Sequence, residues 1–408
     1  MPRPISSRLG LLTFGHLTID SYSSFFSPLL PLLVQKLNLS LTLVGSLVAL
    51  SSITSSFSQP IFGLLSDRMR RPWFVAFGPL TAAVFMSALG LAPTYAVLVA
   101  LLMLAGLGVA AFHPQGAVLT SQIAGRPHVS MAIFITGGTI GFSVGPLFAV
   151  GVVSAFGLER TWVAAVPGLI ASALLLAWFA RVPPRPRHEA KGVPLRELRP
   201  VLRPLSLLYF ATVSRSAVSY GFMTFLPLFL TSRGYSLSAS GLVLSLYLLL
   251  GAIGGFCGGW LSERIGGHRV LVSSFIVAAP LYAAFLLLPD RAGIPCLILG
   301  SFALQSSLAM NVVLGQELSP RHSSTISSLL MGAAWGMGAL IIGPVGALAD
   351  RYGLHAALST LSGMLAVGLT CAALLPGARR TAPVPVADGA AGAARVRDSG
   401  VADSGRLV

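Results

Sequence analysis

Long, continuous apolar runs cover most of this 408-residue chain. They fall near residues 8–34, 42–66, 72–92, 95–124, 128–156, 161–181, 204–232, 238–262, 269–289, 292–317, 322–350 and 354–376. Each run is long enough for a membrane-spanning helix, which needs about 20 apolar residues. Only 10% of the residues are Asp, Glu, Lys or Arg, against about 25% in an ordinary soluble domain. The pattern therefore predicts an all-α polytopic membrane protein with twelve transmembrane helices. It excludes a soluble or disordered chain, and it disfavours a β-barrel, whose strands alternate apolar and polar residues.

A segment at 182–203, rich in Pro and charge, separates the sixth run from the seventh. We therefore predict an N-terminal six-helix bundle at 1–181, a basic cytoplasmic linker at 182–203 and a C-terminal six-helix bundle at 204–376. From residue 377 to residue 408 the chain has no apolar period, and we predict a disordered cytoplasmic tail there.

The positive charges are unevenly distributed between the connecting segments. The expected outer loops hold only Lys36, Arg160, Arg233, Arg291 and Arg351 of the 27 Lys and Arg residues. Arg215 lies within a helix, and the remaining ones fall in expected cytoplasmic segments. This bias predicts that both termini are cytoplasmic. It also explains the net charge of +15 without a nucleic-acid partner. We further predict a multi-pass protein of a bacterial-type inner membrane.

The two predicted bundles are related in sequence. A shift of 196 residues aligns the second run with the eighth without a gap. It pairs Ser40, Gly45, Gly63, Asp67 and Arg68 with Ser236, Gly241, Gly259, Glu263 and Arg264. A shift of 198 residues places Gly145-Pro146 on Gly343-Pro344. Parallel repeats of this kind are expected for the two halves of a transporter.

Several motifs point to one family. The loop GLLSDRMRRP (63–72) and its second-half counterpart GWLSERIGGHR (259–269) resemble the G-x-L-x-D-R-x-x-R-R signature of the major facilitator superfamily. The segment GGTIGFSVGPLFAVG (137–151) resembles the G-x-x-x-G-P motif of proton-coupled drug antiporters. The segments GHLTIDSYSSFFSPLLPLL (15–33), AFHPQG (111–116) and VVLGQELSPRH (312–322) are similar to those of the fosmidomycin-resistance family of exporters.

The resemblance implies roles for residues at the helix ends and packing faces. Gating is expected to involve Gly63, Asp67, Arg68, Arg71, Glu263 and Arg264. Asp67 is expected to face the N-terminal end of the eleventh helix, where the helix dipole favours an anion. Helix packing is expected at Gly137, Gly141, Gly145, Pro146, Gly343 and Pro344, and at the glycines 251, 255 and 259. Leu102 stands where such antiporters carry an arginine, which weakens the case for an arginine-assisted proton step.

Few ionisable residues lie at bilayer depth, where each is costly and is expected to face a cavity. His16, Asp20, His113 and Arg215 belong to the first, fourth and seventh predicted helices, which by resemblance line the cavity. We predict Asp20 as the proton-carrying carboxylate, opposed by Arg215, with His16 and His113 as proton relays. The alternatives are a static Asp20–Arg215 ion pair and neutral histidines bonded to backbone carbonyls.

Arg215 is also a candidate substrate anchor because a guanidinium binds a carboxylate or phosphonate through two parallel hydrogen bonds. Tyr22, Phe25, Gln305 and Asn311 are further candidates for substrate binding. Each has an alternative role, since aromatic residues in membrane helices often pack and amides often join helices.

These observations predict a proton-coupled secondary transporter that exports a small anionic or amphiphilic drug or metabolite, fosmidomycin-like by resemblance, through alternating access. The alternative is an importer or uniporter of a small metabolite in the same fold. We expect no enzyme, because no catalytic, metal-ligand or phosphate-binding motif is present. We expect no cofactor. The predicted partners are a small-molecule substrate, protons and the lipid bilayer, and a monomer is sufficient because one chain supplies both halves.

Overall fold

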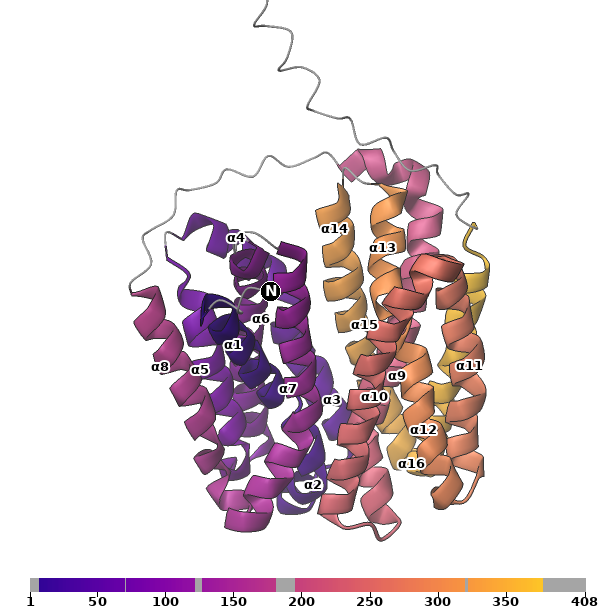
Figure 1. Cartoon of the computed structure of the whole chain (residues 1–408). Coiled ribbons are helices and arrows are strands. Elements are labelled where there is room, and N and C mark those ends of the chain that lie inside the picture. Colours follow the sequence, from indigo (N-terminus) through magenta and orange to yellow (C-terminus); the bar gives the residue numbers. More distant parts are fainter. Residues whose placement is uncertain (1–6, 70, 122–126, 181–194, 320–321, 377–408) are drawn as a thin grey trace, which may run out of the picture. The chain divides into compact units, whose positions relative to one another are not determined.

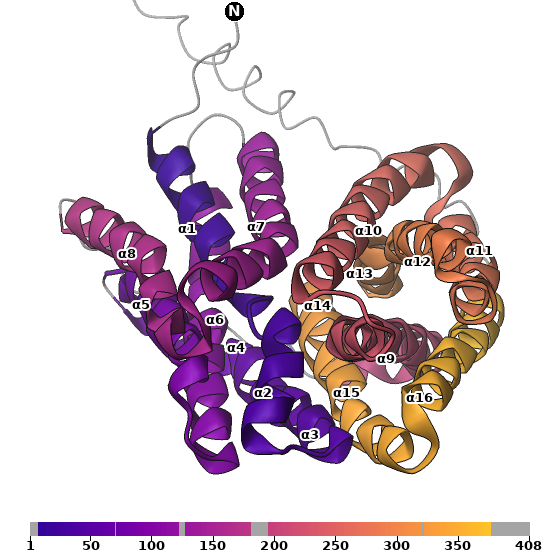
Figure 2. The same cartoon turned by 90° about the horizontal axis from the view of Figure 1, so that it is seen from below.

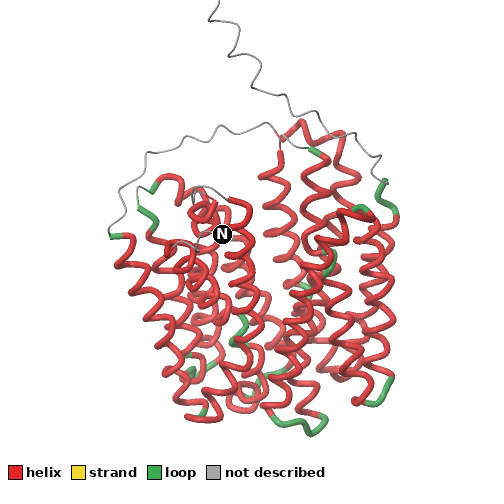
Figure 3. The backbone as a smooth tube through the Cα atoms, viewed as in Figure 1, coloured by secondary structure: helices red, strands yellow, loops and turns green. Residues whose placement is uncertain are grey.

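The chain folds almost entirely into helices. The computed structural model describes residues 7–69, 71–121, 127–180, 195–319 and 322–376, and no strand occurs among them (Figure 3). The first half contains α1 (Ser7–Ser23), α2 (Leu30–Leu37), α3 (Leu41–Ser52), α4 (Gln59–Arg68), α5 (Trp73–Ser87), α6 (Tyr95–Ser121), α7 (Pro127–Phe156) and α8 (Val166–Phe179). The second half contains α9 (Leu202–Ser232), α10 (Leu237–Ile265), α11 (Gly267–Leu287), α12 (Asp290–Gln305), α13 (Leu308–Leu318), α14 (Ser323–Ser327), α15 (Ala334–Leu340) and α16 (Ile342–Ala373).

Each of the twelve predicted spans corresponds to helix in the structure, although several are interrupted. The first span comprises α1 and α2, which are separated by a 3₁₀ turn at Ser27–Leu29. The second contains a π-helical segment at Ile53–Phe57 between α3 and α4, and the eleventh contains another at Ser328–Ala333 between α14 and α15. Gly353, with φ of +86°, divides α16 between the last two spans. The predicted all-α, twelve-helix fold is therefore confirmed.

Large apolar side chains face outward along the helices. Phe256 is 79% exposed and Leu287 is 78% exposed, which suits a hydrocarbon surrounding and not water. Nine stretches of the described residues are helical, long and apolar enough to cross a membrane. The predicted spans 322–350 and 354–376 fall in one of these stretches. The spans at 8–34 and 204–232 are not among them, and these two hold the polar residues His16, Asp20 and Arg215.

The helices pack mainly within two groups, α1–α8 and α9–α16 (Figure 1). In the first group α1 lies against α5, α7 and α8, and in the second α9 lies against α15 and α16. The sequence repeat appears locally at the starts of α3 and α10. The hydroxyl of Ser40 accepts a hydrogen bond from the Leu43 N–H, and that of Ser236 accepts one from the Ala239 N–H. Both serines thus act as N-caps of equivalent helices.

Part of the predicted domain organisation lies outside the described residues. This applies to the linker up to residue 194 and to the whole predicted tail. The remainder of the linker begins with a 3₁₀ helix at Leu195–Val201, and α9 follows directly at Leu202. The domain boundaries therefore stay a prediction.

The two helix groups meet closely along α3 and α16, and also along α7 and α10 (Figure 2). A Cβ atom added at Gly45 of α3 would lie 2.2 Å from the carbonyl oxygen of Ile342. One added at Gly346 of α16 would lie 2.2 Å from the carbonyl oxygen of Leu41. Both positions need glycine because backbone approaches backbone there.

Asp350 of α16 caps the N-terminus of α3, which belongs to the other half. Its carboxylate accepts hydrogen bonds from the Leu41 N–H at 2.6 Å, the Thr42 N–H at 2.7 Å and the Thr42 hydroxyl at 2.6 Å. The first N–H groups of a helix have no partner within the helix, and the helix dipole favours an anion beside them. Asp350 therefore stabilises the contact between the two halves at this end of the molecule.

We expect Asp350→Ala to weaken this contact by about 1 kcal/mol, the usual effect of losing a helix cap. A free-energy change of this size shifts the equilibrium between closed and open arrangements of α3 and α16 roughly fivefold toward the open one. It is measured as faster maleimide labelling of a cysteine at Val48, which is only 8% exposed, in a background without Cys257, Cys296 and Cys371. Asp290→Ala is the matched control because Asp290 pairs with Arg233 within one half. Equal labelling rates in the Asp350 and Asp290 variants would contradict this role.

Candidate functional site

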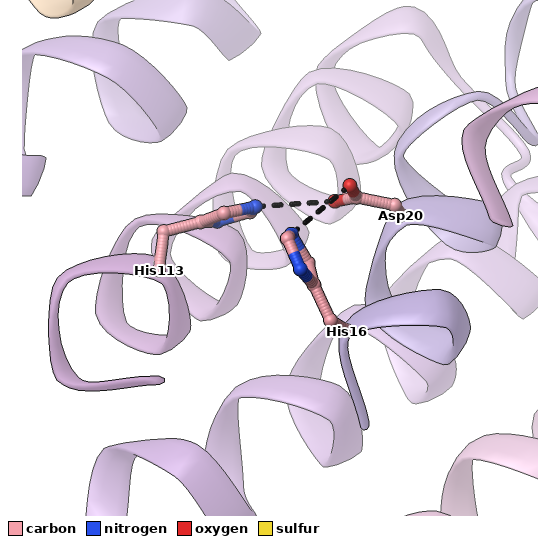
Figure 4. A group of neighbouring side chains, drawn as sticks. All are labelled: His16, Asp20 and His113. Atoms are coloured by element: carbon pink, nitrogen blue, oxygen red, sulfur yellow. Dashed lines mark hydrogen bonds and ion pairs between the residues drawn. The ribbon is translucent and has the colours of Figure 1, made fainter. Parts of the chain in front are cut away.

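Three ionisable side chains converge inside the first helix group (Figure 4). His16 and Asp20 lie one turn apart on α1, and His113 comes from α6. The Nε2 atom of His16 is 3.3 Å from one carboxylate oxygen of Asp20, and the Nε2 atom of His113 is 3.1 Å from the other. The side chains of His16, Asp20 and His113 are 9%, 16% and 27% exposed. We call these three residues the His–Asp–His cluster.

Backbone carbonyl groups fix the orientation of both imidazole rings. The Nδ1 atom of His16 is 2.8 Å from the carbonyl oxygen of Phe134, and that of His113 is 2.8 Å from the carbonyl oxygen of Val109. A carbonyl oxygen only accepts, so each Nδ1 carries the proton of that hydrogen bond. The ring of His16 also stacks on Phe134, with 4.1 Å between centroids. Both Nε2 atoms are therefore held toward the Asp20 carboxylate.

This orientation has a consequence for charge. In a neutral imidazole with the proton on Nδ1, the Nε2 atom carries a lone pair. Two such lone pairs facing a carboxylate would place three acceptors together with no donor among them. The arrangement is satisfied when protons lie between the Nε2 atoms and the carboxyl group, or when a metal ion binds all three. The ligand atoms all lie within 4.8 Å of one another, so the set can hold a metal ion.

Glycines on α7 bring this helix against α1 beside the cluster. A Cβ atom at Gly138 would lie 2.5 Å from the Nε2 atom of His16 and 2.6 Å from an oxygen of Asp20. The predicted packing glycines Gly137, Gly141 and Gly145 lie along the same helix. Their added Cβ atoms would meet Thr13 at 2.4 Å, the Leu17 carbonyl oxygen at 2.0 Å and the Ser24 hydroxyl at 2.0 Å. These glycines thus pack α7 on α1 within one half.

Other residues assigned to packing lie at the contact between the halves. A Cβ atom at Gly241 of α10 would lie 3.7 Å from the carbonyl oxygen of Pro146. Gly343 approaches α3, where its Cα atom would be 3.0 Å from a Cβ atom at Gly45. Pro344 follows it in the first turn of α16. The second glycine stripe differs from its predicted spacing. Gly251 and Gly254 approach α12 and Gly258 approaches Ser306 directly after it, while Gly259 has no atom within 4 Å of an added Cβ.

Arg215 lies in the other helix group, on α9, and its residue is only 1% exposed. One guanidinium nitrogen donates to the side-chain oxygen of Gln305 at 2.8 Å, and another donates to the Ser216 hydroxyl at 3.5 Å. The guanidinium carbon is 5.2 Å from the ring centroid of Trp335. The Nε atom has no hydrogen-bond partner among the described residues. No carboxylate of the described residues lies within 4 Å of Arg215, so neither Asp20 nor any other acid pairs with it there.

The remaining candidates for substrate binding are buried. Gln305 contacts Arg215 as described, whereas the amide of Asn311 is buried and has no hydrogen-bond partner among the described residues. The Tyr22 hydroxyl donates to the Ala164 carbonyl oxygen at 2.5 Å and accepts from the Gly168 N–H at 3.1 Å. Phe25 is fully buried beside it, with 6.2 Å between the ring centroids. These contacts favour the packing alternative for Tyr22 and Phe25.

We expect Tyr22→Phe to lower the thermal stability of the protein without changing its choice of substrates. The change leaves the Gly168 N–H and the Ala164 carbonyl group buried without their partner, which costs about 1–3 kcal/mol. The measurements are thermal unfolding of the purified protein and transport of a substrate panel. Tyr352→Phe serves as the control because Tyr352 is 60% exposed. A changed order of substrates in Tyr22→Phe would restore the substrate-binding prediction.

The residues assigned to gating are only partly described. The side chains of Asp67 and Arg68 lie outside the described residues, so the predicted contact with the eleventh helix stays a prediction. Gly63 lies within α4, and an added Cβ atom there would meet only Pro114, at 3.9 Å. Arg71 is partly exposed, and Glu263 and Arg264 are exposed at the end of α10. The guanidinium of Arg264 stacks on Trp260 of the same helix, 4.0 Å from its ring centroid.

Sequence reasoning did not single out three residues that shape these sites. Gly138 permits the approach of α7 to the His–Asp–His cluster, and Trp335 and Tyr220 form an aromatic pair beside Arg215 with 6.3 Å between their centroids. Gly138 directly follows Gly137 of the predicted glycine stripe, so the sequence could have indicated it as a further packing position. Trp335 is separated from Arg215 by 120 residues, and nothing in its local sequence marks it.

Two halves of six predicted helices, related by a parallel repeat and each holding a buried polar site, define a helical membrane transporter. The sequence profile of the Major Facilitator Superfamily matches residues 12–344. Since this match covers most of the chain, the chain belongs to the major facilitator superfamily, and the resemblance found in the sequence is confirmed. The protein is accordingly a multi-pass membrane transporter of a small molecule and not an enzyme.

Known proteins similar to this chain include two bacterial resistance proteins. The fosmidomycin resistance protein of Escherichia coli (strain K12) is 26% identical over 377 residues, which cover 88% of this chain and 92% of that protein. The multi-drug resistance efflux pump PmrA of Streptococcus pneumoniae serotype 4 is 27% identical over 289 residues, which cover 67% and 71%. The fold is similar to the inward-facing, unoccupied crystal structure of a bacterial homologue of the human lysosomal transporter Spinster. The TM-score is 0.74 at 18% identity, over 91% of this chain and 96% of that one.

Proposed function

We propose that this transporter exports a small anionic or amphiphilic drug or metabolite in exchange for protons. The observation that carries the proposal is the separation of two buried sites. The His–Asp–His cluster in one half requires a cation, and Arg215 in the other half is a buried cation without an acidic partner among the described residues. A transporter that exchanges a proton for an anionic compound needs one site of each kind.

Arg215 supports an anionic substrate. A buried, unpaired charge is costly, and a carboxylate or phosphonate would offset much of that cost through charge-assisted hydrogen bonds. Gln305 and Ser216 occupy two guanidinium nitrogens through neutral acceptors only. An anionic group can displace these weaker contacts, and Trp335 offers an apolar face beside it. An amphiphilic substrate with one acidic group therefore suits this site.

The His–Asp–His cluster supports the proton as the coupling ion. Asp20, His16 and His113 are proposed to hold the coupling protons, because Nε2 of each ring is aimed at a carboxylate that can accept from it. Among the described residues Arg215 does not pair with Asp20, which does not favour coupling through competition between substrate and Asp20 for Arg215. We propose instead that the two sites are coupled through alternating access, in which both halves move together.

The similar proteins support export as the direction of transport. Two of them are named for drug resistance or efflux, and Gly145-Pro146 belongs to a motif typical of antiporters. From the sequence we further propose that the protein lies in a bacterial-type inner membrane with both termini in the cytoplasm. We also propose that Asp67 and Arg68 take part in gating and that the protein functions as a monomer.

The test uses inside-out vesicles with an acid interior, prepared with a metal chelator present. Fosmidomycin is added first, then a panel of anionic and cationic drugs, and release of protons from the vesicles is followed. We expect at least one anionic compound to trigger proton release that is absent from vesicles without the protein. Uptake of a labelled anionic compound without proton movement would instead support a uniporter of a small metabolite. Absence of proton release with every compound of the panel would favour the other alternative, an importer.

A further inference from the structure

We infer that the His–Asp–His cluster also binds one divalent transition-metal ion, with Zn²⁺ as the best-suited cation. The ligand atoms would be the Nε2 atoms of His16 and His113 and a carboxylate oxygen of Asp20, which all lie within 4.8 Å of one another. This inference deepens the proposed function because it concerns the regulation of the same site. A bound metal ion would occupy the atoms that the coupling protons need and would block transport.

The spacing of the ligand atoms fits a small metal ion. Zn²⁺ binds imidazole nitrogen and carboxylate oxygen at about 2.0–2.2 Å. Ligand atoms around a tetrahedral ion of that size lie roughly 3.3 Å apart. Each nitrogen of the cluster is already within 3.1–3.3 Å of a carboxylate oxygen. The two nitrogens approach different oxygens of Asp20, and rotation of the side chains toward one common oxygen would complete the site.

The surroundings of the histidines are those of metal ligands. A ligating histidine almost always donates its other ring N–H to a carbonyl or carboxylate group, which fixes the ring and its tautomer. Both histidines of the cluster do so, to the carbonyl oxygens of Phe134 and Val109 at 2.8 Å. The Nε2 atom of each ring is then left to bind a cation or to accept a hydrogen bond. This second feature is independent of the distances among the ligand atoms.

The chemistry of the ligands selects the class of metal. Two imidazoles and one carboxylate suit Zn²⁺, Fe²⁺, Co²⁺ and Ni²⁺. Ca²⁺ takes six to eight oxygen ligands, and Mg²⁺ requires oxygen ligands in an octahedron, which the cluster does not offer. Three protein ligands leave at least one position open. His113 is the most exposed of the three side chains, at 27%, so a water molecule can take that position.

The test measures metal binding directly and does not depend on transport. Purified full-length protein without an affinity tag is stripped of metal and titrated with Co²⁺, whose visible absorption reports tetrahedral nitrogen and oxygen ligands. We expect saturation at one Co²⁺ per chain and loss of the absorption when Zn²⁺ is added. Asp20→Asn and His113→Gln should each weaken binding at least about tenfold. His355→Gln is the matched control because His355 lies in the other half and bonds to the Leu286 carbonyl group.

A further variant changes the surroundings of the ligands and none of the ligands themselves. Gly138→Ala keeps all three ligands, but its methyl group would lie 2.5 Å from the His16 ring and should also weaken Co²⁺ binding. Absence of saturable absorption, or equal affinity in the wild type and in all ligand variants, would overturn the inference. Proton release in the presence of chelator together with no Co²⁺ binding would refute the metal site alone. Co²⁺ binding with no substrate-triggered proton release would refute the proposed function alone.

Discussion

Arg215→Lys is expected to lower the transport of an anionic substrate roughly 10- to 100-fold, although the positive charge is kept. This decrease follows from the loss of hydrogen bonds between the guanidinium and the charged group of the substrate, which contribute about 1.5–3 kcal/mol. A lysine ammonium cannot present the planar pair of N–H donors that matches a carboxylate or phosphonate. It also cannot stack on Trp335 as the guanidinium does at 5.2 Å from the ring centroid. The measurement is the initial rate of substrate-triggered proton release in inside-out vesicles.

The controls separate charge from geometry. Arg233→Lys changes an arginine that pairs with Asp290 at a helix end and should leave the rate unchanged. Gln305→Leu removes the neutral acceptor of the Arg215 guanidinium while keeping similar volume. Because it leaves the arginine free for an anion, we expect it to retain substrate binding more fully than Arg215→Lys does. Full activity of Arg215→Lys would exclude two-point recognition of an anion at this site.

The helices were predictable because membrane spans are defined by length and apolarity, which are local properties of the sequence. The interruptions were not predictable from apolarity. The π-helical segments at Ile53–Phe57 and Ser328–Ala333 lie inside apolar runs, and no charge or proline within them marks an interruption. The glycines of α10 that contact a neighbouring helix were also not fully predictable from the sequence. Two successive steps of four from Gly251 selected Gly255 and Gly259. The 3.6-residue helical repeat favours a step of three followed by a step of four, which brings Gly251, Gly254 and Gly258 to the face that meets residues 301–306.

The sequence indicates which residues form the candidate sites, but it does not indicate which of them contact one another. His16, Asp20, His113 and Arg215 stand out because ionisable residues are rare at bilayer depth. The repeat places Arg215 opposite Ile19 and therefore at a depth similar to that of Asp20, which suggested an Asp20–Arg215 pair. The depth of a residue in the membrane does not determine the direction in which its side chain points. In the structure Asp20 faces His113, 93 positions away in the sequence, and Arg215 faces Gln305. The proposed metal site carries no sequence motif for the same reason, since its ligands come from two separate helices.

Asp20→Asn is expected to abolish substrate-triggered proton release, with a decrease of at least about 100-fold, while the protein still binds an anionic substrate. An asparagine amide cannot take up or release a proton at any accessible pH, and it removes the negative charge that holds two imidazole rings in place. Substrate binding should persist because, among the described residues, Arg215 makes its contacts in the other half and not with Asp20. The measurements are proton release in vesicles with chelator present and substrate affinity of the purified protein by calorimetry.

Two comparisons make the Asp20 result decisive. Asp290→Asn changes a carboxylate at a helix end that pairs with Arg233, and it should leave both proton release and affinity unchanged. His16→Asn and His113→Asn should slow proton release less than Asp20→Asn does, because each leaves the carboxylate and one imidazole in place. Loss of substrate affinity together with proton release in Asp20→Asn would show that the two sites are not separate. Full proton release in Asp20→Asn would exclude this carboxylate as the carrier and leave the histidines as the remaining titratable groups of the cluster.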